Sequence, residues 1–467
     1  MKTLFKAAGL AAVLTSSGAV LAAAPADTID GRWDASLTTK SGTVIPFRLD
    51  LAGSGDNVKG TLYDGFRPYD GSTAATFRDG KLVLNVEHYL TSITAQLNNG
   101  ELDGSVTSQG RGQFQQFSFH AVHHVDSAAA TAANVPNIAG SWVVPLPSAS
   151  AKGEKAFRLI VEQRGAEVGA SLLRVDGDTG EYTGGFKDGK WVLSHFDGSR
   201  PGVITLVPNA DGTVEIQQRN DRPAPAAAAQ PVSAKANSYA PGSEDDAPNG
   251  RNAAKLIAYR PDVAVAKGLP APENYEQHTT ARDPHEKFTF SFPDDHGKLV
   301  SNEDPRFKGK VVLAIVTGTW CPNCHDEAQY LVQLDKKYRD KGLAIVALDF
   351  EEPEQQASLE REHAFVKQYG VKYTYLIAGA PEQMWEKVPQ LNNLNTWPAT
   401  VFVGRDGTVR SVHSGFASPA SGEFNDQLKQ EFTTRIKALL AEKAPVDTKT
   451  TSTAAAGGKP MQVVQAN

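Results

Sequence analysis

Cysteine is almost absent from this chain, with two residues in 467. A framework of structural disulfides, the usual support of small exported domains, is therefore excluded. A zinc centre built only from cysteines is excluded as well, because it needs four ligands and two thiols supply half of them. After the first residues, no continuous apolar run approaches the ~20 residues that span a membrane. Acidic residues outnumber basic ones, and the net charge of −6 speaks against a nucleic-acid partner.

Residues 1–22 have the pattern of a secretory signal peptide. Lys2 and Lys6 form a charged start, an apolar stretch too short for a membrane span follows, and Val20-Leu21-Ala22 places small residues at the cleavage positions. We expect cleavage after Ala22 and export of a chain that does not span the membrane.

The two cysteines form the motif Cys321-Pro322-Asn323-Cys324, where the apolar run Lys310–Val316 ends and a helical pattern begins. A thiolate at the start of a helix faces the positive end of the helix dipole, so its pKa falls and it becomes a nucleophile near neutral pH. The motif therefore indicates redox chemistry. His325 follows directly, however, and Cys-x-x-Cys-His is also the attachment motif of c-type haem. On the motif alone both chemistries stay open, although a haem usually needs a second axial Met or His.

The N-terminal half contains an internal repeat. The segment 77–81, Phe-Arg-Asp-Gly-Lys, recurs as Phe-Lys-Asp-Gly-Lys at 186–190, and the same offset of 109 pairs Trp33 with Trp142. Short alternating runs separated by Asp-Gly and Asn-Gly turns predict β structure in each copy. We therefore predict two tandem duplicated all-β modules followed by an α/β domain.

Composition sets the predicted boundaries. The first module covers residues 23–124 and the second 137–220, with an Ala-rich connector at 125–136. Residues 221–283 are predicted to be a linker, rich in Pro and Ala over its first part, because such a composition buries too little apolar area to fold. Residues 284–444 form the α/β domain, and the tail 445–467, rich in Thr, Ala and Gly, is expected to be disordered.

Residues 284–444 resemble the thioredoxin-fold, periplasmic thiol-disulfide oxidoreductases of the TlpA and ResA type. The resemblance is carried by the strand beginning Gly309-Lys310-Val311-Val312, by Trp320 before the first cysteine, by the lead-in at 292–298, and by Trp397-Pro398-Ala399-Thr400 before an apolar strand. It covers roughly a third of the chain and leaves the β modules unrecognised.

The resemblance implies an exposed nucleophile, Cys321, a resolving thiol, Cys324, and a cis peptide at Pro398 beside them. It implies that Trp320, Trp397 and Pro398 bind substrate, although Trp397 could instead only pack over Trp320. It also implies that Glu327, one helical turn after Cys324, tunes the thiols in place of the buried Asp that thioredoxins carry where this chain has Ile315. Protein disulfides would be the substrates, a membrane thiol donor would re-reduce the enzyme, and no cofactor would be needed.

Three other functions are compatible with parts of the sequence. A peroxiredoxin is disfavoured because Gly318 and Ala314 stand where its motif has Thr and Pro. The cluster His120, His123 and His124 could bind a metal, but a strand end is the more common explanation, so we predict no metal site. A partner-docking or scaffold protein with an accessory redox domain stays open as a different class of function.

Overall fold

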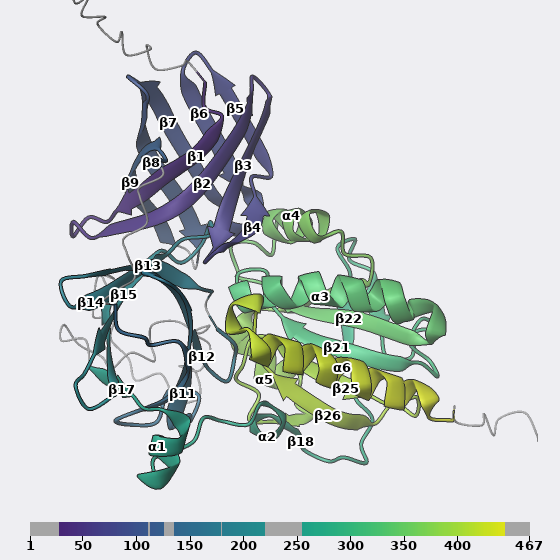
Figure 1. Ribbon diagram of the computed structural model, residues 1–467. Helices are drawn as coiled ribbons and strands as arrows, with labels where there is room; N and C mark the ends of the chain where they lie inside the picture. Colours follow the sequence, from purple (N-terminus) through teal and green to yellow (C-terminus); the bar gives the residue numbers. More distant parts are fainter. Residues whose placement is uncertain (1–27, 111–112, 126–134, 179, 220–254, 444–467) are drawn as a thin grey trace, which may run out of the picture.

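The computed structural model describes residues 28–110, 113–125, 135–178, 180–219 and 255–443. The predicted signal peptide, most of the connector, the Pro/Ala-rich part of the linker and the predicted tail lie outside the described residues. Figure 1 shows two β-rich parts, purple and dark teal, beside an α/β part in green and yellow. We call these parts module 1 (residues 28–125), module 2 (residues 135–260) and the C-terminal domain.

Module 1 is one antiparallel sheet of nine strands in the order β4-β3-β2-β1-β9-β8-β7-β6-β5. Hydrogen bonds between Gly55 and Phe77 join the β2–β3 turn to β5, so the sheet curls back on itself. The strands are β1 Gly31–Thr38, β2 Val44–Ser54, β3 Asn57–Asp64, β4 Arg67–Gly71, β5 Ala74–Arg78, β6 Lys81–Val86, β7 Thr91–Asn98, β8 Glu101–Gly110 and β9 Gln113–His123. A short helix, η1 (Glu87–Tyr89), lies between β6 and β7.

Module 2 is an antiparallel sheet of eight strands in the order β10 to β17, closed by hydrogen bonds between Val143 and Tyr259. Its strands are β10 Gly140–Pro145, β11 Ala156–Arg164, β12 Glu167–Leu173, β13 Tyr182–Lys187, β14 Lys190–His195, β15 Gly202–Pro208, β16 Val214–Arg219 and β17 Leu256–Ala258. The predicted linker 221–283 is therefore wrong at its C-terminal end. Strand β17 lies in it and completes the sheet, because Leu256 and Ala258 bury their side chains in the core of the module.

The two modules share local features at the 109-residue offset. The indole of Trp33 donates to Ile29 O over 2.8 Å, and that of Trp142 donates to Ile138 O over 2.9 Å. Asp79 and Asp188, in the repeated turns, have φ of 51° and 52°. Both sheets follow the chain in an up-and-down order once β4, which has no counterpart, is set aside. The duplication itself stays a prediction.

The C-terminal domain is built on a five-stranded sheet in the order β23-β22-β21-β25-β26, with β21–β23 parallel and β25 and β26 antiparallel. Its strands are β21 Val311–Thr317, β22 Leu343–Phe350, β23 Thr374–Gly379, β25 Ala399–Val403 and β26 Val409–Ser414; its longer helices are α3 Pro322–Tyr338, α4 Glu360–Tyr369 and α6 Glu423–Ala441. Smaller elements of the domain are α2 Tyr275–His278, β18 Thr280–Ala281, β19 Ser291–Pro293, β20 Leu299–Ser301, α5 Met384–Lys387, β24 Leu391–Asn392 and η7 Pro419–Ser421, whereas α1 Pro261–Ala266 packs against module 2.

The central strand β21 is buried on both faces, as its apolar run predicts. Alternate residues face two clusters: Leu313 and Ile315 pack with α3 and α6, and Ala314 and Val316 pack in the cluster that contains both cysteines. Helix α4 begins at Glu360, directly after Leu359, which has a left-handed φ of 52°. Among the described helices, none combines the length and the apolar character that crossing a membrane requires.

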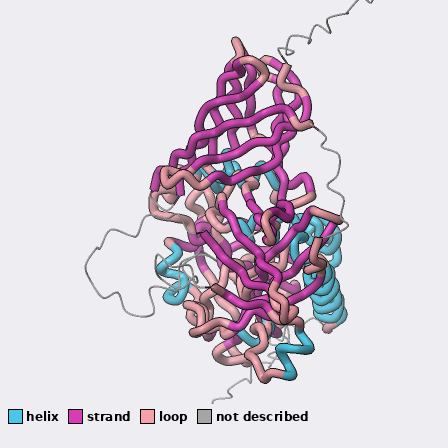
Figure 2. The backbone as a smooth tube through the Cα atoms, turned by 60° about the vertical axis from the view of Figure 1, so that its left-hand side comes forward, coloured by secondary structure: helices cyan, strands magenta, loops and turns pink. Residues whose placement is uncertain are grey.

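The three parts are packed against one another. Leu173 of module 2 belongs to the core cluster of α3 and α6, and Phe196 of module 2 belongs to the core of module 1. Figures 1 and 2 show module 1 at one end of the molecule, with module 2 and the C-terminal domain below it. The dithiol motif at the start of α3 therefore lies near the junction of all three.

Candidate dithiol site

Cys321 is the N-cap residue of α3, and Pro322 occupies the first helical turn. Proline fits there because its missing N–H would have no partner inside the helix. The backbone N–H groups of Cys324 and His325 donate to Cys321 O over 3.0 and 3.3 Å. The predicted strand-to-helix junction is thus confirmed, with Cys321 at the positive end of the helix dipole.

The two thiols differ in acidity. Burial raises the pKa of Cys321, but hydrogen bonds from the Cys324 thiol and backbone N–H and the charge of Arg200 outweigh it, so the pKa lies below that of an ordinary thiol. Burial, followed by the adjacent Cys321 sulfur, holds the pKa of Cys324 well above its usual range. This is the asymmetry that a nucleophile and a resolving thiol need.

The expectation that Cys321 is exposed is wrong in this conformation. Its exposed fraction is 0 %, and that of Cys324 is 2 %. Module 2 lies directly against the motif, because Asp176 O accepts the side-chain amide of Asn323 over 2.8 Å, and the charges of Arg200 and Asp176 act on the Cys321 thiol. A segment far from the motif in sequence therefore packs against it.

The predicted substrate-binding residues surround the dithiol. The Trp397–Pro398 peptide is cis, and the Cys321 thiol donates to Trp397 O over 3.5 Å. Trp397 is fully buried and packs edge to face on Trp320, with ring centroids 5.0 Å apart. Trp397 and Pro398 are both buried here, the packing contact with Trp320 is present, and substrate binding by these residues stays a prediction.

Glu327 lies on α3 one turn after Cys324 and is completely buried. Its pKa is raised to about 8. Burial is the main cause and the charge of Cys321 adds to it, while the hydrogen bond from the Thr400 hydroxyl acts in the opposite direction. Glu327 is therefore not a solvated surface residue. Its carboxyl and the Cys321 thiol influence each other's protonation, which gives it the means to tune the dithiol.

Comparison with known proteins agrees with this geometry. The Redoxin family model matches residues 280–428. Thiol-disulfide oxidoreductase ResA of Bacillus thuringiensis (strain Al Hakam) is 32% identical over 120 residues, 26% of this chain and 62% of that protein. Thioredoxin-like protein YneN of Bacillus subtilis (strain 168) is 30% identical over 126 residues, 26% of this chain and 69% of the relative. The C-terminal domain belongs to the TlpA and ResA type of thioredoxin-fold protein.

This ResA-type domain accounts for part of the chain only, and the chain spans 62% of the length of the first ResA relatives. Among solved structures, a thiol:disulfide interchange protein of the thioredoxin family from Chlorobium tepidum TLS matches with 23% identity and a TM-score of 0.27, over 34% of this chain and 97% of that one. The matched segments leave modules 1 and 2 without a stated role.

His325, on which the haem alternative depends, is committed to other contacts. Its Nε2 donates to Thr319 O over 2.6 Å, its Nδ1 accepts from the Tyr369 hydroxyl over 2.9 Å, and its ring stacks on Tyr89 of module 1 at 4.3 Å. Burial holds its pKa well below the usual range. Service as an axial haem ligand through Nε2 would require this nitrogen to lose its proton and its bond to Thr319 O in a fully buried position, so the residues present do not fit a haem.

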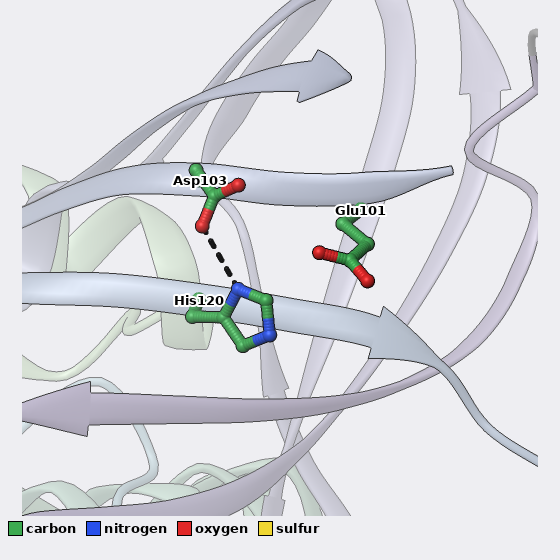
Figure 3. Close-up of side chains that lie close together, drawn as sticks. All are labelled: Glu101, Asp103 and His120. Carbon is green, nitrogen blue, oxygen red and sulfur yellow. Dashed lines mark hydrogen bonds and ion pairs between the residues drawn. The ribbon is translucent and has the colours of Figure 1, made fainter. Parts of the chain in front are cut away.

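The histidine cluster of module 1 has structural partners. His123 ends β9 and stacks on Trp33 at 3.8 Å, and His124 pairs with Asp34 at 2.9 Å. Figure 3 shows His120 hydrogen-bonded to Asp103 on the neighbouring strand, with Glu101 close by. All three of these side chains are exposed. The position of His120 and His123 on β9 agrees with the predicted strand end, and the carboxylates beside His120 were not foreseen.

Sequence reasoning missed the residues of module 2 around the dithiol motif. Asp176 contacts Asn323 and pairs with Lys152, Asp178 binds Ser418 and Ser421, and the charge of Arg200 acts on Cys321. They come from loops of a module with no recognised relative. No spacing signal could have linked them to the Cys-x-x-Cys motif, because the contacts span more than a hundred residues.

Proposed function

We propose that this protein is a thiol-disulfide oxidoreductase that reduces protein disulfides through Cys321 and Cys324. The observation that carries the proposal is the position of Cys321 at the start of α3, with a depressed pKa, beside a Cys324 whose pKa is raised. The ResA relatives carry the same activity in their names, which supports it.

In the proposed reaction, the Cys321 thiolate attacks one sulfur of a substrate disulfide and displaces the other sulfur as a thiolate. The Cys324 thiol then loses its proton and attacks Cys321, which releases the second substrate thiol and leaves a Cys321–Cys324 disulfide. Glu327, the buried carboxyl on the same helix, tunes the protonation of the two sulfurs. Two electrons pass from the dithiol to the substrate.

An external dithiol must then reduce the enzyme, and a membrane thiol donor fits an exported protein. The direction in the cell depends on the reduction potential, since about 30 mV corresponds to ~1.4 kcal/mol for a two-electron couple. Equilibration of the purified protein against glutathione buffers measures that potential. A value well above that of glutathione would mean an oxidase and would overturn the proposed direction.

We also propose export to the periplasm, on the pattern of residues 1–22. The proposed domain plan keeps module 1, module 2 and the ResA-type domain, with module 2 extended to include β17 and Tyr259.

The direct test is reduction of insulin by the full-length protein with dithiothreitol as the electron source. We expect catalysed precipitation of the insulin B chain, and none above the blank for Cys321→Ser. Equal rates for both proteins would refute the function.

A docking or scaffold function is the second candidate, because both modules pack against the redox domain. This function predicts that the rate enhancement differs strongly between a protein that the modules bind and a small disulfide that they do not bind. Equal rate enhancement on insulin and on a small disulfide such as hydroxyethyl disulfide would argue against it, and activity confined to a protein captured by the modules would favour it.

A further inference from the structure

The segment that follows β12 packs against Asn323 of the dithiol motif. We call Arg174–Asp178 the occluding turn. Arg174 and Gly177 exchange backbone hydrogen bonds of 3.0 and 3.1 Å, which folds the segment into a tight turn. Gly177 has a φ of +118°, a conformation that L side chains rarely adopt.

The backbone of this turn meets the dithiol motif directly. Asp176 O accepts the side-chain amide of Asn323 over 2.8 Å and the backbone N–H of Phe416 over 3.3 Å. Gly177 also pairs with Phe416 as an isolated parallel bridge. Asn323 and the backbone of Phe416 thus hold one peptide carbonyl, the kind of main-chain hydrogen bonding by which proteins recognise an extended polypeptide.

The occluding turn and the C-terminal domain approach each other so closely that each has a glycine at the contact, Gly177 in the turn and Gly415 in the domain. A Cβ at Gly177 would lie 2.2 Å from Phe416 O, and a Cβ at Gly415 would lie 2.4 Å from the carbonyl carbon of Asp176. Contacts of this length do not occur, so a methyl group at either position would force the two segments apart.

Buried charges anchor the turn. The Asp178 carboxylate accepts hydrogen bonds from the backbone N–H of Ser418, from its hydroxyl and from the Ser421 hydroxyl, and all three residues are fully buried. On the other side, Asp176 pairs with Lys152 of its own module, again out of solvent. Hydrogen bonds to a buried carboxylate are costly to break without replacement, so the turn is held against the domain.

We propose that the occluding turn is an intramolecular stand-in for a substrate chain: it closes the dithiol, and a disulfide-bearing polypeptide reaches Cys321 only when the turn withdraws. This inference rests on the proposed oxidoreductase function, because the site that the turn closes is the proposed redox site. Withdrawal frees Asn323 Nδ2 and the Phe416 N–H to receive a carbonyl of the incoming chain. Module 2 is then the element that controls access.

Access is measured without catalysis, by the alkylation of Cys321 in the reduced full-length protein with iodoacetamide, followed by peptide mass spectrometry. Rates are compared at their high-pH plateau, where the thiol is ionised and only accessibility limits them. Gly177→Ala should react at least tenfold faster than the parent. The matched control is Gly189→Ala, which has a φ of +80° but open space around a Cβ and should react like the parent.

A second variant and its control test the hydrogen bonds of Asp178 instead of the close contact at Gly177. Asp178→Ala should also expose Cys321, and Glu167→Ala, an exposed acid at the other end of β12, should not. Circular dichroism shows whether each variant keeps its fold. If Gly177→Ala or Asp178→Ala unfolds, Ser421→Ala, which removes a single hydrogen bond to Asp178, takes its place.

The two proposals fail separately. A parent protein alkylated as fast as Gly177→Ala, but still active on insulin, overturns the occlusion and leaves the oxidoreductase. Variants that expose Cys321 without any protein in the series reducing insulin overturn the oxidoreductase and leave the occlusion. If both hold, Gly177→Ala should reduce insulin faster than the parent.

Discussion

Asn323 of the Cys-Pro-Asn-Cys motif donates its side-chain amide to the backbone carbonyl of Asp176, 147 residues earlier in the chain, over 2.8 Å. Asn323 is only 1 % exposed, so this contact is shielded from competing water. One of the two residues between the cysteines is thereby tied to module 2. The behaviour of the dithiol should depend on a part of the chain that lies outside the ResA-type domain.

The first prediction concerns the two thiols. Cys321→Ser should lower insulin reduction to the level of the blank, because the thiolate that attacks is lost. Cys324→Ser should attack once and stall, since the resolving sulfur is gone, and a mixed disulfide should accumulate that dithiothreitol releases. Non-reducing gels and intact mass spectrometry detect the adduct. The roles are reversed if Cys321→Ser traps the substrate and Cys324→Ser does not.

Much of the C-terminal domain could be predicted from the sequence. The apolar run of β21 indicated a strand, and the start of a helix at the dithiol motif was predicted from the point where that run ends. The cis peptide before Pro398 followed from the family resemblance alone. Local patterns succeed here because burial and turn chemistry in this domain are set by residues close in sequence.

The covered state of Cys321 could not be predicted, because it depends on long-range contacts. Strand β17 was missed for a related reason: three residues beyond a Pro/Ala-rich segment carry no period long enough to detect, and only pairing with β16 makes them a strand. The left-handed φ of Leu359, the residue directly before α4, likewise could not be predicted, because leucine as a residue type does not favour that conformation.

Glu327 should impose a pH dependence on stability. Its folded pKa of about 8 lies above its ordinary value of 4.5. Between these values the native protein keeps a proton that the unfolded chain has released, so the free energy of unfolding falls as pH rises through this window and levels off above it. Glu327→Gln should reduce that slope by up to about 1.4 kcal/mol per pH unit. Urea unfolding at pH 5, 7 and 9 measures it.

The same variant should change thiol chemistry. Ionised Glu327 opposes ionisation of Cys321, so the iodoacetamide reactivity of the parent should titrate over a broader, higher pH range than that of Glu327→Gln. Glu423→Gln, an exposed acid at the start of α6, is the control. If the iodoacetamide reactivity of the parent and of Glu327→Gln depends on pH in the same way, Glu327 does not tune the dithiol.

Processing gives a separate prediction. If residues 1–22 are a signal peptide, the exported protein begins at Ala23. N-terminal sequencing of the protein from a periplasmic fraction checks the cleavage position. Recovery of intact Met1 in that fraction would be inconsistent with a cleaved signal.

The last prediction tests the duplication. Trp33 and Trp142 are fully or nearly buried, and each donates its indole N–H to the carbonyl four residues earlier, Ile29 O or Ile138 O. Trp33→Phe and Trp142→Phe each leave that carbonyl unpaired, which costs about 1–3 kcal/mol, so each should raise hydrogen exchange in its own module by a similar factor. Phe114→Leu, at a side chain that is 68 % exposed, should leave exchange unchanged. If one tryptophan holds its module together while the other can be replaced without effect, the two modules are not copies of one structural plan.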